Sequence, residues 1–273
     1  MKTDEIAQTA AGDDLAEEGP SFMTKVKGFF IEMALLSAFT WKFFKELFKR
    51  PFEFNEIARQ CYIIGCRTLP LVGITGFIMG LVLTIQSRPT LAEFGAESWL
   101  PAMVAVSIIR EIGPVITALI CAGKVGSGIG AELASMKVTE QIDAMQVSGR
   151  RPFKYLAVTR MIATTLMVPL LVIFSDTISM FGSFFGCNLK GDISSHLFFS
   201  QVFEKLDFMD IMPAFIKTIF FGFGIGLIAC YKGFNSDKGT EGVGKSANSA
   251  VVIGSLLVFL IDMIAVQLTS LFS

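Results

Sequence analysis

The sequence has few of the residues that active-site chemistry requires. It contains one histidine, so neither a histidine metal cluster nor a Ser-His-Asp triad can be built on that residue alone. Its five cysteines include no CxxC pair, and most lie in or beside apolar runs, so packing explains them better than metal or disulfide bonding. A membrane-bound enzyme is therefore a weak hypothesis, and we expect no metal and no catalytic residue.

Charge is scarce as well. Only 17% of the 273 residues are charged and 52% are hydrophobic, with a mean hydropathy of +0.62, which excludes an ordinary soluble domain. The net charge of −1 provides no basic field for nucleic acid. Residues 1–21 are acidic and lack the apolar core of a secretory signal. We interpret this segment as a disordered acidic tail.

Residues 22–50 have the periodicity of an amphipathic helix. Phenylalanine, tryptophan and aliphatic residues share one face, and lysine and glutamate occupy the other. A basic, aromatic helix of this kind is typical of the membrane interface. Packing against other protein is the alternative. Pro51 is expected to end the helix.

Five apolar runs follow, each close to the roughly 20 residues that a bilayer demands. Basic loops face the cytoplasm, and the loops alternate between poor and rich in lysine and arginine. We therefore expect an all-α membrane protein whose 51–273 region crosses the membrane five times, with a cytoplasmic N-terminus and an external C-terminus. The runs are approximately Tyr62–Gln86, Leu100–Gly123, Met161–Cys187, Ile211–Tyr231 and Ser249–Phe272.

Three of these runs contain GxxxG pairs, at Gly76–Gly80, Gly182–Gly186 and Gly222–Gly226. Small residues at this spacing let helix backbones approach closely in lipid. The pairs predict tight packing but do not say whether the partner helix belongs to this chain or to a second copy in a symmetric dimer.

Two charges, Arg110 and Glu111, lie inside the second run. Each costs roughly 2.5–3.5 kcal/mol at the centre of a membrane on insertion scales. Neighbours on a helix point about 100° apart, so the two do not simply pair with each other. Pro114 cannot donate a hydrogen bond to the Arg110 carbonyl, and Gly113 adds backbone freedom, so we expect the helix to open there.

A polar, locally broken site within a membrane is a functional candidate. A structural ion pair with another span is the alternative. The possible partners in other spans are Arg67, Lys217 and Asp262.

The second run leads into a stretch too rich in charge to lie in the membrane. We predict one helix near residues 131–148, broken at Gly149 and Pro152. It either docks into a soluble partner or is a solvated connecting helix. Its candidate docking residues are Glu132, Met136, Glu140, Asp143, Ala144, Met145 and Gly149.

Residues 239–246, GTEGVGKS, satisfy the phosphate-binding pattern GxxxxGK[ST]. That pattern works between a buried strand and a helix, where backbone amides surround the phosphates. Here it follows a membrane run within a short connection, with no room for a parallel sheet. We therefore expect no nucleotide site and no cofactor in this chain.

Residues 110–149, REIGPVITALICAGKVGSGIGAELASMKVTEQIDAMQVSG, closely resemble the signature of the MlaE (YrbE) permeases, which are membrane subunits of ABC transporters associated with MCE proteins. Residues 239–252 are similar to the family's second signature. The resemblance extends from about Phe54 to the C-terminus. Lys124 and Lys245 stand where the family often has arginine. Lysine keeps the positive charge but lacks the guanidinium group that binds an anion through two N–H donors.

The resemblance implies a homodimer that binds cytoplasmic ATPase subunits, which would hold ATP and Mg²⁺. It also implies a periplasmic MCE ring, in some systems a small STAS-type subunit, and phospholipid carried between the inner and outer membranes. Arg110, Glu111, Gly113 and Pro114 fall on the motif beside the family's lipid cavity. The helix near 131–148 falls on its coupling helix, and residues 143–149 have the spacing of the EAA-type motif of importer permeases.

A secondary transporter or channel, with the intramembrane charges as an ion path, is the competing hypothesis. Such a protein does not need the long basic loop with its EAA-like spacing. That loop therefore favours the permease subunit of an ABC transporter.

Overall fold

The computed structural model describes residues 22–49, 52–189, 193–237 and 239–272. The predicted acidic tail, residues 1–21, lies outside them. The chain forms two units, residues 1–42 and 43–273, and the boundary falls within helix α2 (Phe22–Leu47). This helix coincides with the predicted amphipathic helix and ends shortly before Pro51. Its location in the membrane interface stays a prediction.

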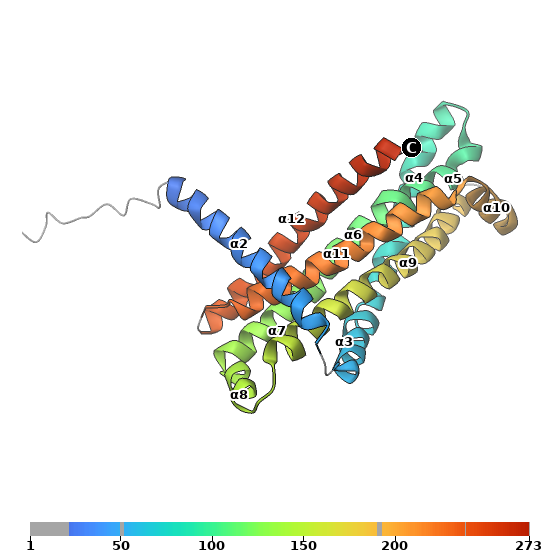
Figure 1. The fold of residues 1–273 in the computed structure, drawn as a ribbon. Helices are drawn as coiled ribbons and strands as arrows, with labels where there is room; N and C mark the ends of the chain where they lie inside the picture. Colours follow the sequence, from blue (N-terminus) through green and yellow to red (C-terminus); the bar gives the residue numbers. More distant parts are fainter. Residues whose placement is uncertain (1–21, 50–51, 190–192, 238, 273) are drawn as a thin grey trace, which may run out of the picture. The chain divides into compact units, whose positions relative to one another are not determined.

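The described part of the second unit is helical and contains no strand (Figure 1). Five helical stretches are long and apolar enough to cross a membrane, which confirms the predicted all-α fold with five spans. Several of these helical stretches are longer than the apolar runs, because helical turns with polar residues extend them at one or both ends. The stretches are Phe54–Glu93, Glu97–Val138, Phe153–Asn188, Ile211–Phe234 and Thr240–Leu271.

The first stretch is two helices, α3 (Phe54–Cys66) and α4 (Leu69–Glu93), where the sequence predicted one uninterrupted span. Pro70 lies in the first turn of α4, and its ring cannot donate to the carbonyl four residues earlier. The break leaves the Arg67 carbonyl to accept a hydrogen bond from the Lys124 ammonium.

The second stretch alternates between α-helix and π-helical turns. Elements α5 to α7 follow one another in it without a loop, and a wider turn in such a helix often marks a functional position. Its elements are η1 (Glu97–Trp99), α5 (Leu100–Ser107), the π-turn η2 (Ile108–Ile112), α6 (Gly113–Cys121), the π-turn η3 (Ala122–Gly126) and α7 (Ser127–Val138).

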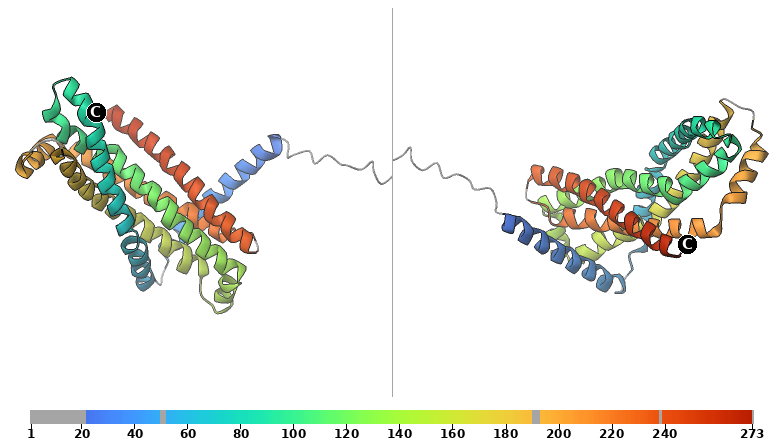
Figure 2. Two further views of the ribbon diagram at one scale, coloured as in Figure 1. Left: turned by 180° about the vertical axis from the view of Figure 1, so that it is seen from behind. Right: turned by 90° about the horizontal axis from the view of Figure 1, so that it is seen from above.

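The remaining helices complete the second unit. The π-turn η4 (Phe153–Val158) leads into α9 (Thr159–Asn188), which runs beside α4 and α11 (Figure 2). The short helices α8 (Gln141–Val147) and α10 (Ser195–Lys205) lie at opposite ends of the bundle (Figure 1). The last two spans are α11 (Phe208–Phe234) and α12 (Thr240–Phe272).

The GxxxG glycines are used for packing inside the chain. The carbonyl of Gly76 accepts a hydrogen bond of 2.9 Å from the Ser179 hydroxyl, and a Cβ at Gly80 would overlap the Ser179 carbonyl. Gly182 packs in return on the backbone of Phe77, and Gly222 packs on Thr164. The predicted tight packing is confirmed, and these glycines hold α4 and α11 against α9.

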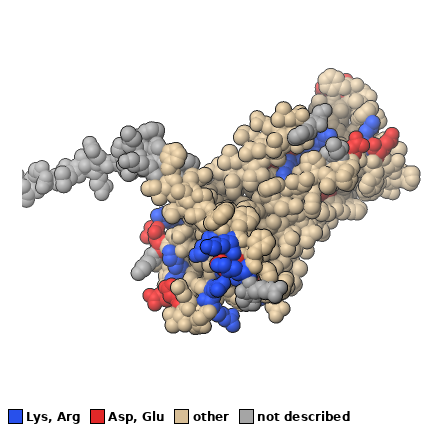
Figure 3. Space-filling model, in the orientation of Figure 1, with Lys and Arg blue, Asp and Glu red and all other residues tan. Residues whose placement is uncertain are grey.

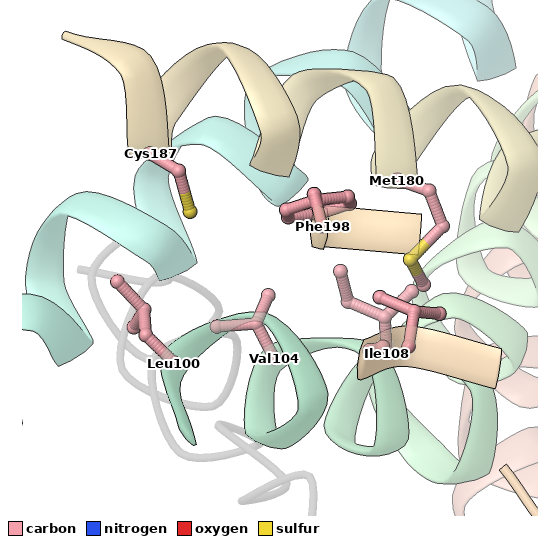
Figure 4. Close-up of a cluster of buried hydrophobic side chains, with 8 residues drawn as sticks. Leu100, Val104, Ile108, Met180, Cys187 and Phe198 are labelled. Carbon is pink, nitrogen blue, oxygen red and sulfur yellow. The ribbon is translucent and has the colours of Figure 1, made fainter. Parts of the chain in front are cut away.

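An apolar cluster closes the end of the bundle where α10 lies. Phe198 of α10 is fully buried and projects between α5 and α9 (Figure 4). Leu100, Val104 and Ile108 approach it from one side, and Cys187 approaches it from α9. Burial of these side chains fixes the start of the second span, and therefore the position of the charges that follow Ile108.

Candidate functional site

The predicted opening of the second span is present as the π-turn η2. The amide of Gly113 donates to the carbonyl of Ile108, five residues earlier, instead of the usual four. Pro114 follows in the first turn of α6 and cannot donate to Arg110. Arg110 and Glu111 thus lie within the wider turn, and both line the same cavity.

Glu111 takes part in a charged cluster formed by three spans. The Lys217 ammonium of α11 lies 2.6 Å from Glu111 Oε2 and 2.9 Å from Asp262 Oδ1 of α12. The Lys217 side chain is 5% exposed, so its charge is balanced by the two carboxylates rather than by water. Two of the three partners suggested by the sequence, Lys217 and Asp262, are therefore at the site, while Arg67 lies at the α3–α4 break.

A cavity of about 390 Å³ borders this cluster. It lies in the half of the bundle where α11 begins and α12 ends, away from α8. Charged side chains of both signs and small apolar side chains line it together, which suits an amphiphilic molecule better than a bare ion. The lining residues include Arg110, Glu111, Asp207, Ala214, Lys217 and Val266.

The other two predicted cavity residues lie deeper, against a residue that the sequence analysis missed. Asp176 of α9 has an enclosed Oδ1 atom without a hydrogen-bond partner among the described residues. A Cβ at Gly113 would overlap this atom, and Pro114 lines a separate cavity of about 50 Å³ with Asp176. A lone carboxylate inside the run Met161–Cys187 was the signal that could have identified Asp176.

The predicted coupling helix is two helices, not one. Helix α7 ends at Val138, and the Thr139 hydroxyl donates to the Ser135 carbonyl at 2.8 Å. Glu140 then adopts a left-handed conformation with φ 58°, which turns the chain into α8. Residues 131–148 contain no glycine or proline, so the sequence has no ordinary helix-breaking signal at this turn. The predicted end is present: Gly149, with φ 77°, and Arg150 return hydrogen bonds to the last turn of α8.

Helix α8 rests on one buried residue and exposes the rest. Ile142 is buried, whereas Asp143 and Ala144 are exposed and Met145 is half-buried. Val147 is 90% exposed, an apolar side chain at the tip of a charged loop that the sequence analysis did not single out. Val147 lies one helical turn from Asp143 and Ala144, so the three share the exposed side of α8.

Glu132 and Met136 lie on α7, before the turn. Glu132 pairs with Arg160 of α9, with 2.8 Å between its Oε1 and the arginine Nη2, and is half-exposed. Arg160 is 2% exposed and also donates to the Leu156 carbonyl. Of the predicted docking residues, Glu132 is therefore also an anchor between α7 and the third span.

The phosphate-loop pattern forms the first turns of α12 and follows α11, with no strand before it in the described residues. Lys245 pairs with Asp237 at 3.2 Å, and the Ser246 hydroxyl donates to the Lys232 carbonyl at 3.0 Å. These two side chains thus connect α12 to the end of α11 and do not face a common loop.

Comparisons with known proteins agree with this architecture. The family profile described as Permease MlaE matches residues 57–268. A "probable ABC transporter permease protein" of Rickettsia prowazekii is 37% identical over 236 residues, covering 86% of this chain and 91% of the relative. A "probable ABC transporter permease protein" of Pyropia yezoensis is 36% identical, over 77% of this chain and 80% of the relative.

A further relative has a more specific name. The "intermembrane phospholipid transport system permease protein MlaE" of Haemophilus influenzae is 33% identical over 78% of this chain and 82% of its own. A secondary transporter or channel does not fit these relatives. The chain, a multi-pass membrane protein, therefore belongs to the MlaE family of ABC transporter permeases.

Proposed function

We propose that this chain is the permease subunit of a transporter that moves phospholipid between the inner and outer membranes of a double-membraned cell. The observation that carries the proposal is the Glu111–Lys217–Asp262 cluster beside the cavity of about 390 Å³. Its charges can hold a polar headgroup, and the apolar spans around it can hold acyl chains. The Haemophilus influenzae relative, named for intermembrane phospholipid transport, supports this substrate.

The chain performs no covalent chemistry in this proposal. Two copies bind two cytoplasmic ATPase subunits, which hold ATP and Mg²⁺, and hydrolysis shifts the dimer between states of different lipid affinity. The exposed Asp143, Ala144 and Val147 of α8 supply the docking surface. Glu132 transmits movement of that surface to the third span through Arg160.

The proposed location is a bacterial inner membrane, with the N-terminus in the cytoplasm and the C-terminus in the periplasm. The lysine- and arginine-rich segment around α8 favours this orientation. The cavity then lies in the periplasmic half of the spans, where an MCE ring receives or delivers lipid. A small STAS-type subunit is a further candidate on the cytoplasmic side.

The Glu111→Gln variant tests the cavity assignment. It keeps the side-chain volume but removes a charged partner of Lys217, so we expect lipid transport to fall by about tenfold, the equivalent of one charge-assisted hydrogen bond. Transport is measured between donor and acceptor vesicles with the reconstituted complex. Glu97→Gln, at an exposed carboxylate paired with Arg88 outside the cavity, is the matched control. Normal transport by a correctly assembled Glu111→Gln complex would show that the cluster does not handle lipid.

A further inference from the structure

A basic surface lies where the first and third spans begin. Its cations, which we call the basic patch, are the exposed Arg59, Arg150 and Arg151, the half-buried Lys49 and the buried Lys154 beneath them. Figure 3 shows lysine and arginine atoms gathered at the end of the bundle that carries α8. The first helical stretch begins at Phe54 and the third at Phe153. The patch therefore lies on the polar side of the apolar runs that begin near Tyr62 and Met161, where a bilayer would place its headgroups.

Side-chain contacts gather the patch into two groups, one around each of two carboxylates, and we call the two groups together the network. Glu46 accepts from Lys49 at 2.5 Å and lies 3.7 Å from Arg151. This hydrogen bond from Lys49 lowers the pKa of Glu46, which keeps the carboxylate ionised. The Lys154 ammonium donates to the Lys49 carbonyl and lies 5.2 Å from the centre of the Phe52 ring.

The second carboxylate, Glu56, is buried and has its oxygens occupied. Gln60 donates to Oε1 at 2.8 Å, and the Tyr155 hydroxyl donates to Oε2 at 3.2 Å. Arg59 lies 3.5 Å from Oε2, and Arg150 stacks over the Tyr155 ring at 5.6 Å.

The charge that this network presents outward is positive. Its carboxylates are enclosed, with 15% exposure for Glu46 and 9% for Glu56, whereas the Arg59 and Arg151 side chains are 69% and 63% exposed. Each guanidinium has five N–H donors, and one contact with a carboxylate leaves several of them directed outward. Lys154 is buried, but the four other cations still outnumber three carboxylates when the half-buried Glu53 is included.

Exposed aromatic side chains flank the cations. Phe48 is 79% exposed, Phe54 is 69% exposed and Phe52 is 44% exposed. Rings that enter the acyl boundary beside cations that remain at headgroup level are typical of a surface that binds lipid.

We propose that the basic patch is a binding site for the phosphate of an anionic phospholipid in the leaflet on the α8 side, distinct from the cavity beside Glu111. Guanidinium groups match phosphate oxygens in a bidentate manner, which favours Arg59 and Arg151 as the main contacts. The site selects lipid by charge, because the negative surface of a leaflet attracts each nearby cation. This inference requires only that the chain spans a membrane and does not rest on the transported substrate.

The test is native mass spectrometry of the full chain released from nanodiscs of phosphatidylcholine with a minority of phosphatidylglycerol. We expect wild type to retain phosphatidylglycerol above its bulk ratio. In the Arg59→Gln/Arg151→Gln variant the enrichment should fall by about fivefold for each cation removed, down to the bulk ratio at most. Lys137→Gln/Lys245→Gln, which removes two exposed cations from the same end outside the patch, should retain wild-type enrichment.

Three results would overturn the proposal. The first is equal enrichment in both double variants, or none in wild type. The second is displacement of the lipid by inorganic phosphate at the same concentration, which would assign the site to free phosphate. The third is an Arg59→Gln/Arg151→Gln variant that keeps its lipid but no longer binds the ATPase, which would make the patch a protein docking surface. Unchanged thermal unfolding in detergent confirms that the exposed substitutions leave the fold intact.

Discussion

Arg160 and Glu132 form an asymmetric ion pair. Arg160 is 2% exposed, whereas Glu132 is 53% exposed, and the arginine Nε has no hydrogen-bond partner among the described residues. The arginine therefore depends on Glu132, while the glutamate can be solvated without its partner. Loss of Glu132 should therefore destabilise the fold more than loss of Arg160.

We expect Glu132→Ala to lower stability by about 1–3 kcal/mol, because it leaves a buried cation without its carboxylate. Arg160→Met should cost less, since it removes the buried charge and leaves Glu132 to the solvent. Thermal unfolding in detergent measures both variants. Equal losses, or a larger loss for Arg160→Met, would mean that packing of the arginine stem and not the ion pair holds α7 to α9.

Individual charges were partly predictable from the sequence. Arg110 and Glu111 were identifiable because a charge within an apolar run is costly wherever the helix packs. The sequence could not predict that Lys217 and Asp262, and not Arg67, lie beside Glu111, because this depends on which faces of three helices meet. Asp176 could have been identified as a lone carboxylate in an apolar run, but its contact with Gly113 depends on how α6 and α9 pack.

The packing of α4 on α9 depends on glycines that allow no side chain. We expect Gly80→Ala to destabilise the bundle by about 2 kcal/mol, because the added methyl group would overlap the Ser179 carbonyl and force the helices apart. Gly123→Ala is the matched control, because a Cβ there meets no atom within 4 Å. Its thermal unfolding temperature in detergent should stay equal or rise slightly. A Gly80→Ala variant as stable as Gly123→Ala would refute this close contact.

Helix α8 is the element through which we expect the ATPase to act. Asp143→Arg reverses an exposed charge on it and should reduce co-purification of the ATPase by at least about tenfold, as expected for a docking contact at the centre of an interface. The control is Asp237→Arg, the same reversal at a 71% exposed carboxylate between α11 and α12. An unchanged yield of ATPase with Asp143→Arg would exclude α8 as the docking element.

At the level of elements, the sequence predicted the helices better than their interruptions. Long apolar runs define the spans because few alternatives can bury them. The separation of α7 from α8 depends on the left-handed conformation of Glu140. Glutamate rarely adopts this conformation, so the sequence does not predict it. Pro70 was the available signal for the α3–α4 break, and Pro114 correctly indicated the opening at η2.

For the whole molecule, the alternation of basic loops and the number of apolar runs were sufficient to predict a five-span membrane protein. The assembly was not predictable from the residues alone. The GxxxG glycines were compatible with a dimer interface, but they pack helices within the chain. Helix α12 exposes large apolar side chains such as Leu256, Phe259 and Met263. Lipid or a second copy would cover that face.

The central claim, an ATPase-coupled permease that holds phospholipid at the Glu111 cluster, is tested most directly by native mass spectrometry of the complex from its own host. The subunits are counted in the wild-type complex, and the lipid is measured in the Arg59→Gln/Arg151→Gln background, in which we expect no lipid at the basic patch. We predict two copies of this chain, two ATPase subunits and bound phospholipid, with the lipid lost when Glu111→Gln and Asp262→Asn are added. A complex without ATPase, or lipid retained despite these two substitutions, would contradict the account.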